Sequence, residues 1–239
     1  MRDRVLKLHD KTKEPTRSAL SPLQRCTMTV SASPTARRKR AVESFQSAAE
    51  CIGPVRAGMD GIFAITRGQW SMIDAVLHCL DQLATNPVTL SLWTWTVAEY
   101  EIQCLERLML DKRLKAAMLV IDHGARGKNK ALLEKWISIF GPGSVRFVVN
   151  HSKIATIEGA GAKLLLRGSM NLNFNPRFEQ FDLTEGGEDF ALVKSIETEL
   201  ETLPIDCSGA DAYRSSRVSG VFDQQTLSLF SKDVKPWAK

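Results

Sequence analysis

Residues 150–173 read NHSKIATIEGAGAKLLLRGSMNLN, with two apolar runs on either side of a glycine-rich centre. This pattern predicts a β-hairpin, because the apolar runs suit strands and the glycines suit the turn between them. His151 and Lys153 begin the first run, and Ser169 and Asn171 end the second. Antiparallel pairing would therefore bring an imidazole, an ammonium, a hydroxyl and a carboxamide to one end of the hairpin.

The same reasoning extends upstream along residues 144–158, which we expect to form one extended segment. Side chains alternate between the two faces of a strand. His151 and Lys153 would then share a face with Val145, Phe147 and Val149.

Strand-like and helix-like segments alternate through most of the remaining chain. The apolar and β-branched segments are 61–66, 87–95, 115–122, 144–158 and 163–171. The segments with helical spacing of apolar residues are 68–83, 97–110, 129–141 and 188–203. This order predicts an α/β fold in which helices flank both faces of a mixed β-sheet.

Charge is distributed unevenly and suggests how the chain is divided. Residues 1–44 carry eleven Lys or Arg and four Asp or Glu, whereas residues 45–239 carry 21 Lys or Arg and 23 Asp or Glu. We expect residues 1–44 to be a basic, disordered tail, because they contain too few large apolar residues to build a core. Residues 45–210 are then the α/β domain and residues 211–239 a C-terminal extension.

The basic tail has two interpretations. In the first, the tail is a solvated leader or lies upstream of a misassigned start; in the second, it is an arm that seeks phosphate groups. We favour the first interpretation.

Composition restricts the remaining classes. No apolar run approaches the length of a membrane span, and there is no apolar segment typical of a secretory signal. The five cysteines form no C-x-x-C pair, which favours reduced thiols, a cytoplasmic location and no metal site. We expect no cofactor.

The four polar side chains of the hairpin suit a tetrahedral phosphate. Lys153 and Asn171 can donate to its oxygens, Ser169 adds a hydroxyl, and neutral His151 is a competent nucleophile near pH 7. H-x-K and G-S-x-N each occur by chance in structural positions. Together, in this order across a hairpin, they are far more specific.

These residues resemble a known signature. His151-Ser152-Lys153, Glu158 and Gly168-Ser169-Met170-Asn171 are similar to the H-x-K-x4-D…G-S-x-N pattern of the phospholipase D superfamily. The resemblance extends over about residues 57–205. In particular, the chain resembles the small members that carry one motif per chain, a group that includes bacterial endonucleases. Glu158 stands where the family usually has Asp.

The resemblance implies a mechanism. In the family the histidine forms a phosphohistidine intermediate without a metal, and single-motif chains form homodimers so that two motifs face each other. Carried over, His151 is the nucleophile or the acid, Lys153 and Asn171 hold the phosphate, and Ser169 supports them.

The family also uses a downstream carboxylate to orient the histidine. The candidates are Asp182 and Glu179, and the spacing from Asn171 favours Asp182. An alternative role for Glu179 is a surface ion pair with Arg177.

Three further residues are candidates for substrate binding. Gly168 belongs to the motif, and Arg67 follows a predicted strand and could face the same cleft. His123 follows another strand, and it either lines the cleft or is a solvent-facing loop residue. Trp93 and Trp95 share a strand face and fit a core or a dimer interface better than a base-stacking platform, because no basic run is interleaved with them.

These features predict a metal-independent phosphodiesterase, most simply a nuclease, that acts as a homodimer on a nucleic acid. DNA and RNA are not distinguished. One alternative is a non-catalytic DNA-binding or assembly protein that keeps the phosphate site. Another is a phospholipid phosphodiesterase, which the lack of a lipid-docking segment rich in Lys and Trp disfavours.

Overall fold

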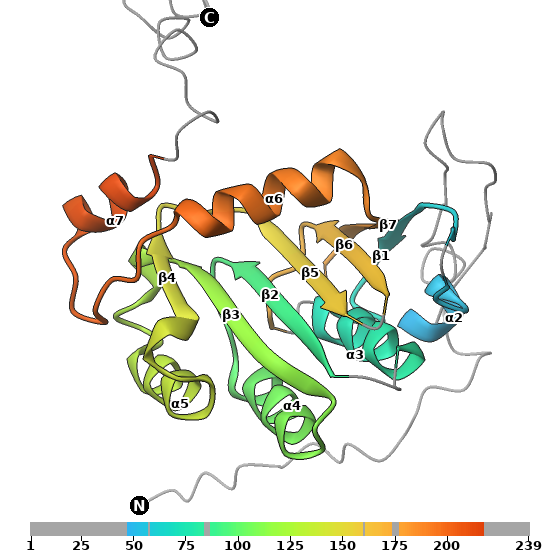
Figure 1. The fold of residues 1–239 in the computed structure, drawn as a ribbon, viewed down its shortest axis with the longest axis horizontal. Helices are drawn as coiled ribbons and strands as arrows, with labels where there is room; N and C mark the ends of the chain where they lie inside the picture. Colours follow the sequence, from blue (N-terminus) through green and yellow to red (C-terminus); the bar gives the residue numbers. More distant parts are fainter. Residues whose placement is uncertain (1–46, 57, 84–86, 160, 174–176, 218–239) are drawn as a thin grey trace, which may run out of the picture.

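A computed structural model describes residues 47–56, 58–83, 87–159, 161–173 and 177–217 (Figure 1). The predicted tail, residues 1–44, lies outside the described residues, as does the extension beyond residue 217. Among the described residues, no helix is long and apolar enough to cross a membrane.

In the described part of the chain, seven strands form one mixed sheet in the order β1-β7-β6-β5-β2-β3-β4. They are β1 (Ile62–Thr66), β2 (Val88–Thr94), β3 (Leu114–Asp122), β4 (Val145–Val148), β5 (Lys153–Gly159), β6 (Ala162–Gly168) and β7 (Glu179–Glu185). β2, β3 and β4 run parallel, and the other neighbours are antiparallel.

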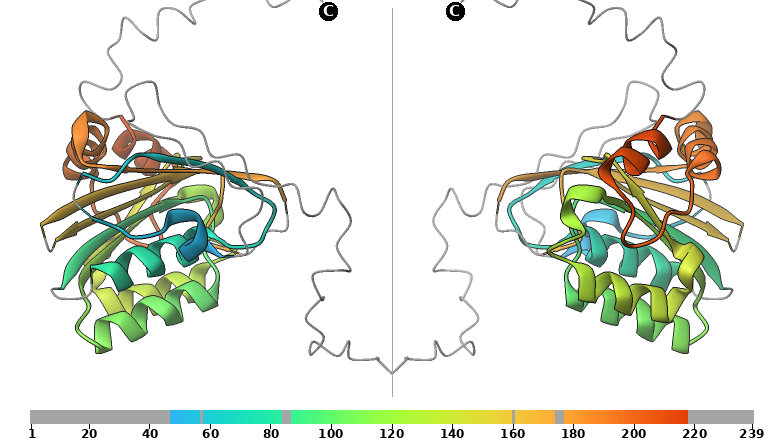
Figure 2. Two further views of the ribbon diagram at one scale, coloured as in Figure 1. Left: turned by 90° about the vertical axis from the view of Figure 1, so that its right-hand side faces the viewer. Right: turned by 90° about the vertical axis from the view of Figure 1, so that its left-hand side faces the viewer.

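Helices cover both faces of this sheet, which confirms the predicted α/β architecture. The helices are α2 (Ala48–Ile52), α3 (Met72–Gln82), α4 (Glu99–Leu110), α5 (Lys130–Phe140), α6 (Gly187–Glu199) and α7 (Gly209–Ser215). Two short 3-10 turns, η2 (His123–Ala125) and η3 (Pro142–Ser144), begin and end the α5 region. α3, α4 and α5 lie on one face, and α6 crosses the other (Figures 1 and 2).

The local sequence explains why these helices form where they do. Asp74 accepts a hydrogen bond from the backbone N of Ser71 at 2.7 Å, which caps the first turn of α3. Ile73, Val76 and Leu80 then bury one face of the helix against the sheet.

The main core lies between the sheet and α3, α4 and α5. Trp136, Phe147 and Phe181 are fully buried there, and Phe181 meets Trp70 edge-on with ring centroids 5.0 Å apart. A smaller cluster around Leu165 and Phe190 packs beneath α6.

One expectation about the strands is wrong. Residues 144–158 do not form a continuous segment, because β4 is an edge strand and β5 lies in the middle of the sheet. The four residues between them pass the ends of β3 and β2, and Val149 is 62% exposed. The face shared by Val145 through Lys153 therefore does not exist.

The structure also contains a strand that the sequence did not predict. β7 lies between β6 and β1, and its inward residues Phe181 and Leu183 are fully buried. Polar residues alternate with these apolar ones, so the sequence of β7 contains few apolar residues. Its position inside the sheet, rather than its composition, makes it a strand.

The C-terminal end of the described chain packs onto the domain. α7 spans the expected boundary between residues 210 and 211. Its neighbour Ser216 accepts a hydrogen bond from Val149 N at 2.7 Å, and Ser215 accepts one from Glu201 N at 3.2 Å. The described part of the expected extension is thus attached to the edge of the sheet.

Candidate active site

The predicted hairpin is present, and its register brings the candidate residues together. β5 and β6 are antiparallel, with Lys153 opposite Gly168 and Glu158 opposite Lys163. The residues just before β5 and just after β6 therefore lie at the same end of the sheet. This end also carries the last residues of β2 and the first residues of β7.

Asn150 fixes the loop that carries His151. Its buried amide Nδ2 lies 3.2 Å from Thr94 O and 3.5 Å from Val120 O, so it binds the ends of β2 and β3. Its Oδ1 accepts from Ser152 N at 2.8 Å, and its own backbone N donates to Asp122 Oδ2 at 2.9 Å. The loop is held on both sides of His151, whose side chain is exposed.

Lys153 is a buried cation, with 6% of its surface exposed. Its Nζ donates to the backbone O of His151, which uses one of its three donors. Burial lowers the pKa of Lys153 from its ordinary value, and the carboxylates of Glu179 and Asp122 partly offset this by favouring the charged form. The ammonium is therefore partly desolvated and close to two negative groups.

Ser169 is tied to Glu179. The Ser169 hydroxyl donates to Glu179 Oε2 and accepts from Gln180 N at 3.0 Å. Its proton is already committed, so its first role in this arrangement is to hold the carboxylate of Glu179 beside Lys153 rather than to donate to a phosphate. Glu179 is itself buried.

The preference for Asp182 over Glu179 does not agree with this geometry. Asp182 lies on the opposite face of β7, where Arg167 Nη2 and Nε donate to it at 2.6 and 2.9 Å. Arg167 also pairs with Asp189 at 2.6 Å. The physical reason is strand alternation, because residues three apart point to opposite faces. The carboxylate in the cluster is Glu179.

Asn171 reaches the site by crossing the start of β5. Its Oδ1 lies 3.3 Å from Trp95 N and 3.4 Å from Thr94 Oγ1, at the end of β2. The next residue, Leu172, donates from its N to Thr94 Oγ1 at 3.2 Å and accepts from Ala98 N at 2.9 Å. With its oxygen turned toward β2, the amide Nδ2 of Asn171 is the group that can donate to a ligand.

Thr94 joins the two crossing segments and is completely buried. Its carbonyl accepts from Asn150, and its hydroxyl donates to Thr96 O at 2.7 Å while accepting from Leu172 N. Sequence reasoning missed Thr94 and Asn150. Neither residue belongs to the motif. Their contacts depend on the position of β2 between β3 and β5, and only the sheet order shows that position.

The three candidates for substrate binding occupy different positions. Arg67 is exposed at the end of β1, and its guanidinium lies 5.4 Å from the ring centroid of Phe178. His123 Nε2 lies 3.2 Å from Cys207 O, so its ring contacts the segment before α7. No described contact joins His123 to Lys153, Ser169 or Asn171, and its half-buried ring against Cys207 supports neither of the two places considered for it, the cleft or a solvent-facing loop.

Gly168 has a structural role. A Cβ at Gly168 would lie 2.5 Å from Gln180 O, closer than real Cβ contacts. The glycine allows β6 and β7 to approach at the point where Ser169 meets Glu179.

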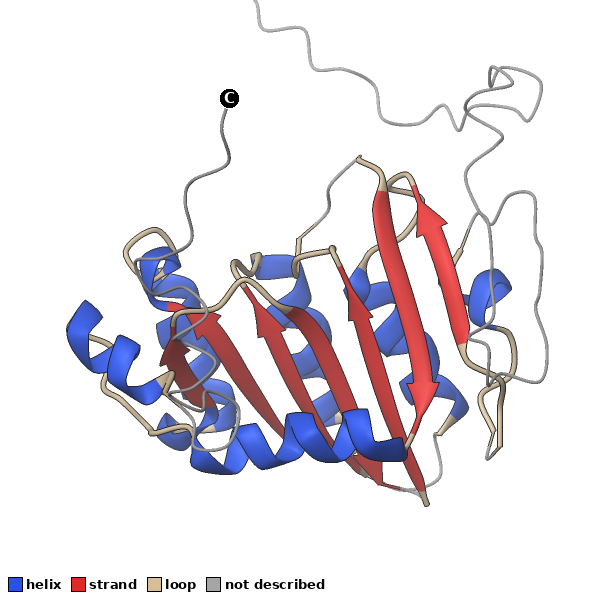
Figure 3. Cartoon of the chain, turned by 90° about the horizontal axis from the view of Figure 1, so that it is seen from above, coloured by secondary structure: helices blue, strands red, loops and turns tan. Residues whose placement is uncertain are grey.

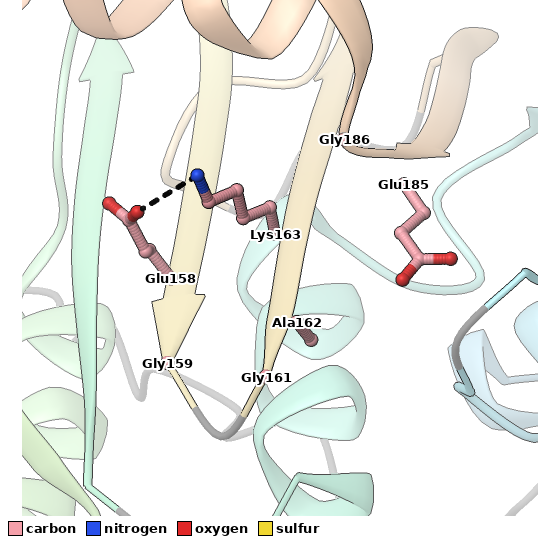
Figure 4. Close-up of a pocket in the computed structure, with 7 residues that line it drawn as sticks. All are labelled: Glu158, Gly159, Gly161, Ala162, Lys163, Glu185 and Gly186. Atoms are coloured by element: carbon pink, nitrogen blue, oxygen red, sulfur yellow. Dashed lines mark ion pairs between the residues drawn. The ribbon is translucent and has the colours of Figure 1, made fainter.

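A cavity of about 500 Å³ lies at the other end of the sheet (Figure 4). It is lined by Glu158, Gly159, Gly161, Ala162, Lys163, Glu185 and Gly186. Lys163 Nζ reaches Glu158 at 3.7 Å. Glu158 lies five residues along β5 from Lys153, a distance of about 17 Å. Glu158 therefore does not belong to the cluster around Lys153.

Comparison with known proteins identifies no family. No protein-family model matches the chain, and no curated protein matches it. A solved polyphosphate kinase from Porphyromonas gingivalis is 21% identical, with a TM-score of 0.49, over 72% of this chain and 29% of that chain. A phosphatidylserine synthase from Haemophilus influenzae Rd KW20 is 11% identical, with a TM-score of 0.38, over 60% of this chain and 39% of that chain.

This chain therefore corresponds to less than half the length of either of these two solved chains. The identities and TM-scores are too low for either similarity to bear on function.

Proposed function

We propose that this protein is a phosphodiesterase of the phospholipase D type that cleaves nucleic acid through a covalent histidine intermediate. The observation that carries the proposal is the cluster at the end of β5 and β6. There an exposed His151 adjoins a buried Lys153, and Asn171 is oriented with its Nδ2 available to donate.

The chemistry divides between these groups. A neutral imidazole nitrogen of His151 attacks phosphorus, a P–N bond forms, and the P–O bond to the leaving oxygen breaks. The remaining donors of Lys153 and the Nδ2 of Asn171 stabilise the negative charge that gathers on the non-bridging oxygens. Water then attacks phosphorus, the P–N bond breaks, and the imidazole is released.

The leaving oxygen requires a proton, and a second copy of the chain supplies it. The described residues of one chain carry one H-x-K motif, so the partner's His151, in its protonated form, is the acid. A homodimer with a two-fold axis near His151 would give each site both roles. The same partner accepts the proton that water loses in the second step.

Glu179 is proposed as the positioning carboxylate. Its contact with Ser169 fixes it at the start of β7, and it favours the charged form of Lys153. It thereby offsets part of the cost of keeping a cation buried before a substrate arrives.

A nucleic acid is the proposed substrate because of charge. The tail sequence has an excess of seven positive charges, and Arg67 and Arg177 are exposed at the site end of the sheet. Polyanions are attracted to such arrangements through their phosphates.

The test is cleavage of plasmid DNA and of a labelled single-stranded RNA in the presence of EDTA. His151→Ala should abolish turnover. Lys153→Ala should slow single-turnover cleavage roughly ten- to a hundredfold, the effect of removing a charge-assisted hydrogen bond that contributes about 1.5–3 kcal/mol. Lys163→Ala removes an exposed lysine from the other end of the same hairpin and is the matched control.

Two outcomes would contradict the proposal. Cleavage by Lys153→Ala at the wild-type rate would show that the cluster is not the phosphate site. Tight nucleic-acid binding without turnover, unchanged in His151→Ala, would favour the non-catalytic binding protein.

A further inference from the structure

Two large apolar side chains are exposed on either side of the proposed phosphate site. Trp95, directly after β2, is 42% exposed, and Phe178, directly before β7, is 64% exposed. Of the two places expected for Trp95, a core or a dimer interface, this exposure excludes the core. Trp93 does pack beneath α6, where its indole N donates to Glu197 at 2.9 Å.

Strand alternation places both exposed rings on the α6 side of the sheet. Trp95 follows Trp93 by two residues, and Phe178 precedes Asp182 by four. α6 begins at Gly187, just beyond the far end of β7, and its C-cap residue Leu200 binds Arg146 near the start of β4. Figure 3 shows this helix running along one end of the strands, so it leaves the site end uncovered.

Along the order of strands, the two rings lie on either side of the site, on the face that carries Asp182 rather than the face of Glu179 and Lys153, so a phosphate that meets both faces must lie over the strand ends. β7, β6, β5 and β2 are consecutive neighbours, so three strand spacings of about 4.8 Å, roughly 14 Å in all, separate the positions of Phe178 and Trp95. The exposed residues His151 and Ser169 lie between them at the ends of β5 and β6.

Positive charge accompanies one of the rings. The Arg67 guanidinium lies 5.4 Å from the Phe178 ring centroid, and Arg177 is the residue next to Phe178. Neither arginine takes part in an ion pair among the described residues. A phosphate on this side of the site would therefore meet the exposed guanidinium group of Arg67.

We infer that the substrate crosses this end of the sheet as a single strand, with bases stacked on Trp95 and on Phe178 and a phosphate between them at His151 and Lys153. The inference rests on the proposed function and adds the form of the substrate. An unpaired base has an open face that stacks on an aromatic ring, whereas a duplex encloses the faces of its bases.

The proposed homodimer places a second His151 near this surface, but the two rings fit an apolar contact with that second copy less well than they fit bases. The exposed residues between the two rings are polar, namely His151, Ser152, Ser169 and Gln180. A stable apolar interface needs a contiguous apolar centre, which two separated rings do not form. Alternating aromatic and cationic contacts around a phosphate site are instead typical of single-strand binding.

The test measures binding in a His151→Ala background, so that it does not depend on cleavage. The probes are a labelled oligothymidylate of about 16 nucleotides and its duplex with oligoadenylate, in EDTA and at several salt concentrations. Trp95→Ala and Phe178→Ala should each weaken single-strand binding roughly 5- to 150-fold, the change that corresponds to ~1–3 kcal/mol per stacked base. Duplex affinity should change little.

Three further variants make the result specific. Trp95→Phe and Phe178→Tyr keep a ring and should retain most of the single-strand affinity. Tyr100→Ala removes an exposed ring from α4, on the other side of the sheet, and should have no effect.

Defined outcomes would overturn the inference. The first is an unchanged single-strand affinity in both alanine variants. The second is an equal loss of affinity for the single strand and for the duplex. A third is a shift of the alanine variants to monomers by light scattering with single-strand affinity retained, which would make a second copy the occupant. The proposed function is tested separately, because a protein with intact His151 that binds single strands through both rings but cleaves nothing would contradict the proposed function alone.

Discussion

At the scale of single residues, the site is held together by hydrogen bonds from side chains to the backbone of neighbouring segments. Lys153 donates to the carbonyl of His151, and Asn150 and Thr94 fix the segments that carry His151 and Asn171. The catalytic groups of the proposal are thus held by main-chain contacts at strand ends. A substitution of one of the holding residues would therefore displace a catalytic group without removing it.

Burial of Lys153 should be visible in stability. Because burial lowers its pKa, the unfolded chain holds more protons than the folded one between the lowered pKa and the usual lysine value of about 10.4. The free energy of unfolding of the wild type relative to Lys153→Met should therefore rise with pH across that alkaline window and stay flat at neutral pH. Urea unfolding from pH 7 to about 10.5 measures this.

Lys163→Met provides the matched removal of an exposed lysine from the same hairpin. If Lys153→Met differs from the wild type by a constant amount at every pH, Lys153 is not held in a desolvated site.

Thr94 should act through the position of Asn171. Thr94→Val keeps the shape but leaves the buried N–H of Leu172 without its hydroxyl partner, a cost of about 1–3 kcal/mol. We expect lower stability and a lower rate of cleavage by protein that remains folded. Circular dichroism and single-turnover kinetics at low temperature measure the two effects.

Thr94→Ser restores the hydroxyl and should recover most of the rate. A Thr94→Val protein that is less stable but cleaves normally would show that Thr94 serves the fold alone.

At the scale of secondary structure elements, the approach of β6 and β7 determines where Ser169 meets Glu179. Gly168→Ala would place a Cβ 2.5 Å from Gln180 O and push the two strands apart at the site end. We expect a decrease of about 1–3 kcal/mol in the free energy of unfolding, typical of overpacking, together with reduced cleavage. Chemical denaturation and the nuclease assay measure both.

Gly143→Ala is the control for this substitution, because a Cβ at Gly143 meets nothing within 4 Å. It should change stability by no more than about 0.5 kcal/mol. Equal behaviour of the two variants would mean that β6 and β7 tolerate a side chain where they meet.

At the scale of the whole molecule, the proposed mechanism requires two copies. Light scattering should give a dimer at the concentration of the assay. Mixing His151→Ala subunits with wild-type subunits should inactivate the mixed dimers, because each shared site then lacks one of its two histidines. A fully active monomer would contradict the shared site.

The basic tail precedes every described helix and strand, the first of which begins at Ala48. Deletion of residues 1–44 should therefore leave the thermal unfolding midpoint nearly unchanged. Binding to DNA should weaken, and the slope of log affinity against log salt should fall by about 0.7–0.9 for each phosphate that the tail no longer neutralises. An unfolded deletion protein would show that the tail is structural.

Much of the fold could be predicted from local patterns. The apolar spacing of α3, α4 and α5 and the β-branched runs of β2 and β3 predicted these elements and the α/β class, because period and propensity are local properties. β7 was missed, since Glu179 and Asp182 make its sequence polar, and burial by neighbouring strands decides its conformation.

The sequence by itself determined the hairpin of β5 and β6 and the set of side chains at its end. Those features follow from turn chemistry and from the alternation of residues along a strand. Only the tertiary structure decided that β4 lies at the edge while β5 lies beside β2, that Glu179 rather than Asp182 belongs to the cluster, and that Thr94 and Asn150 hold it. Strand order is set by the packing of the whole sheet against its helices, and no local pattern encodes it.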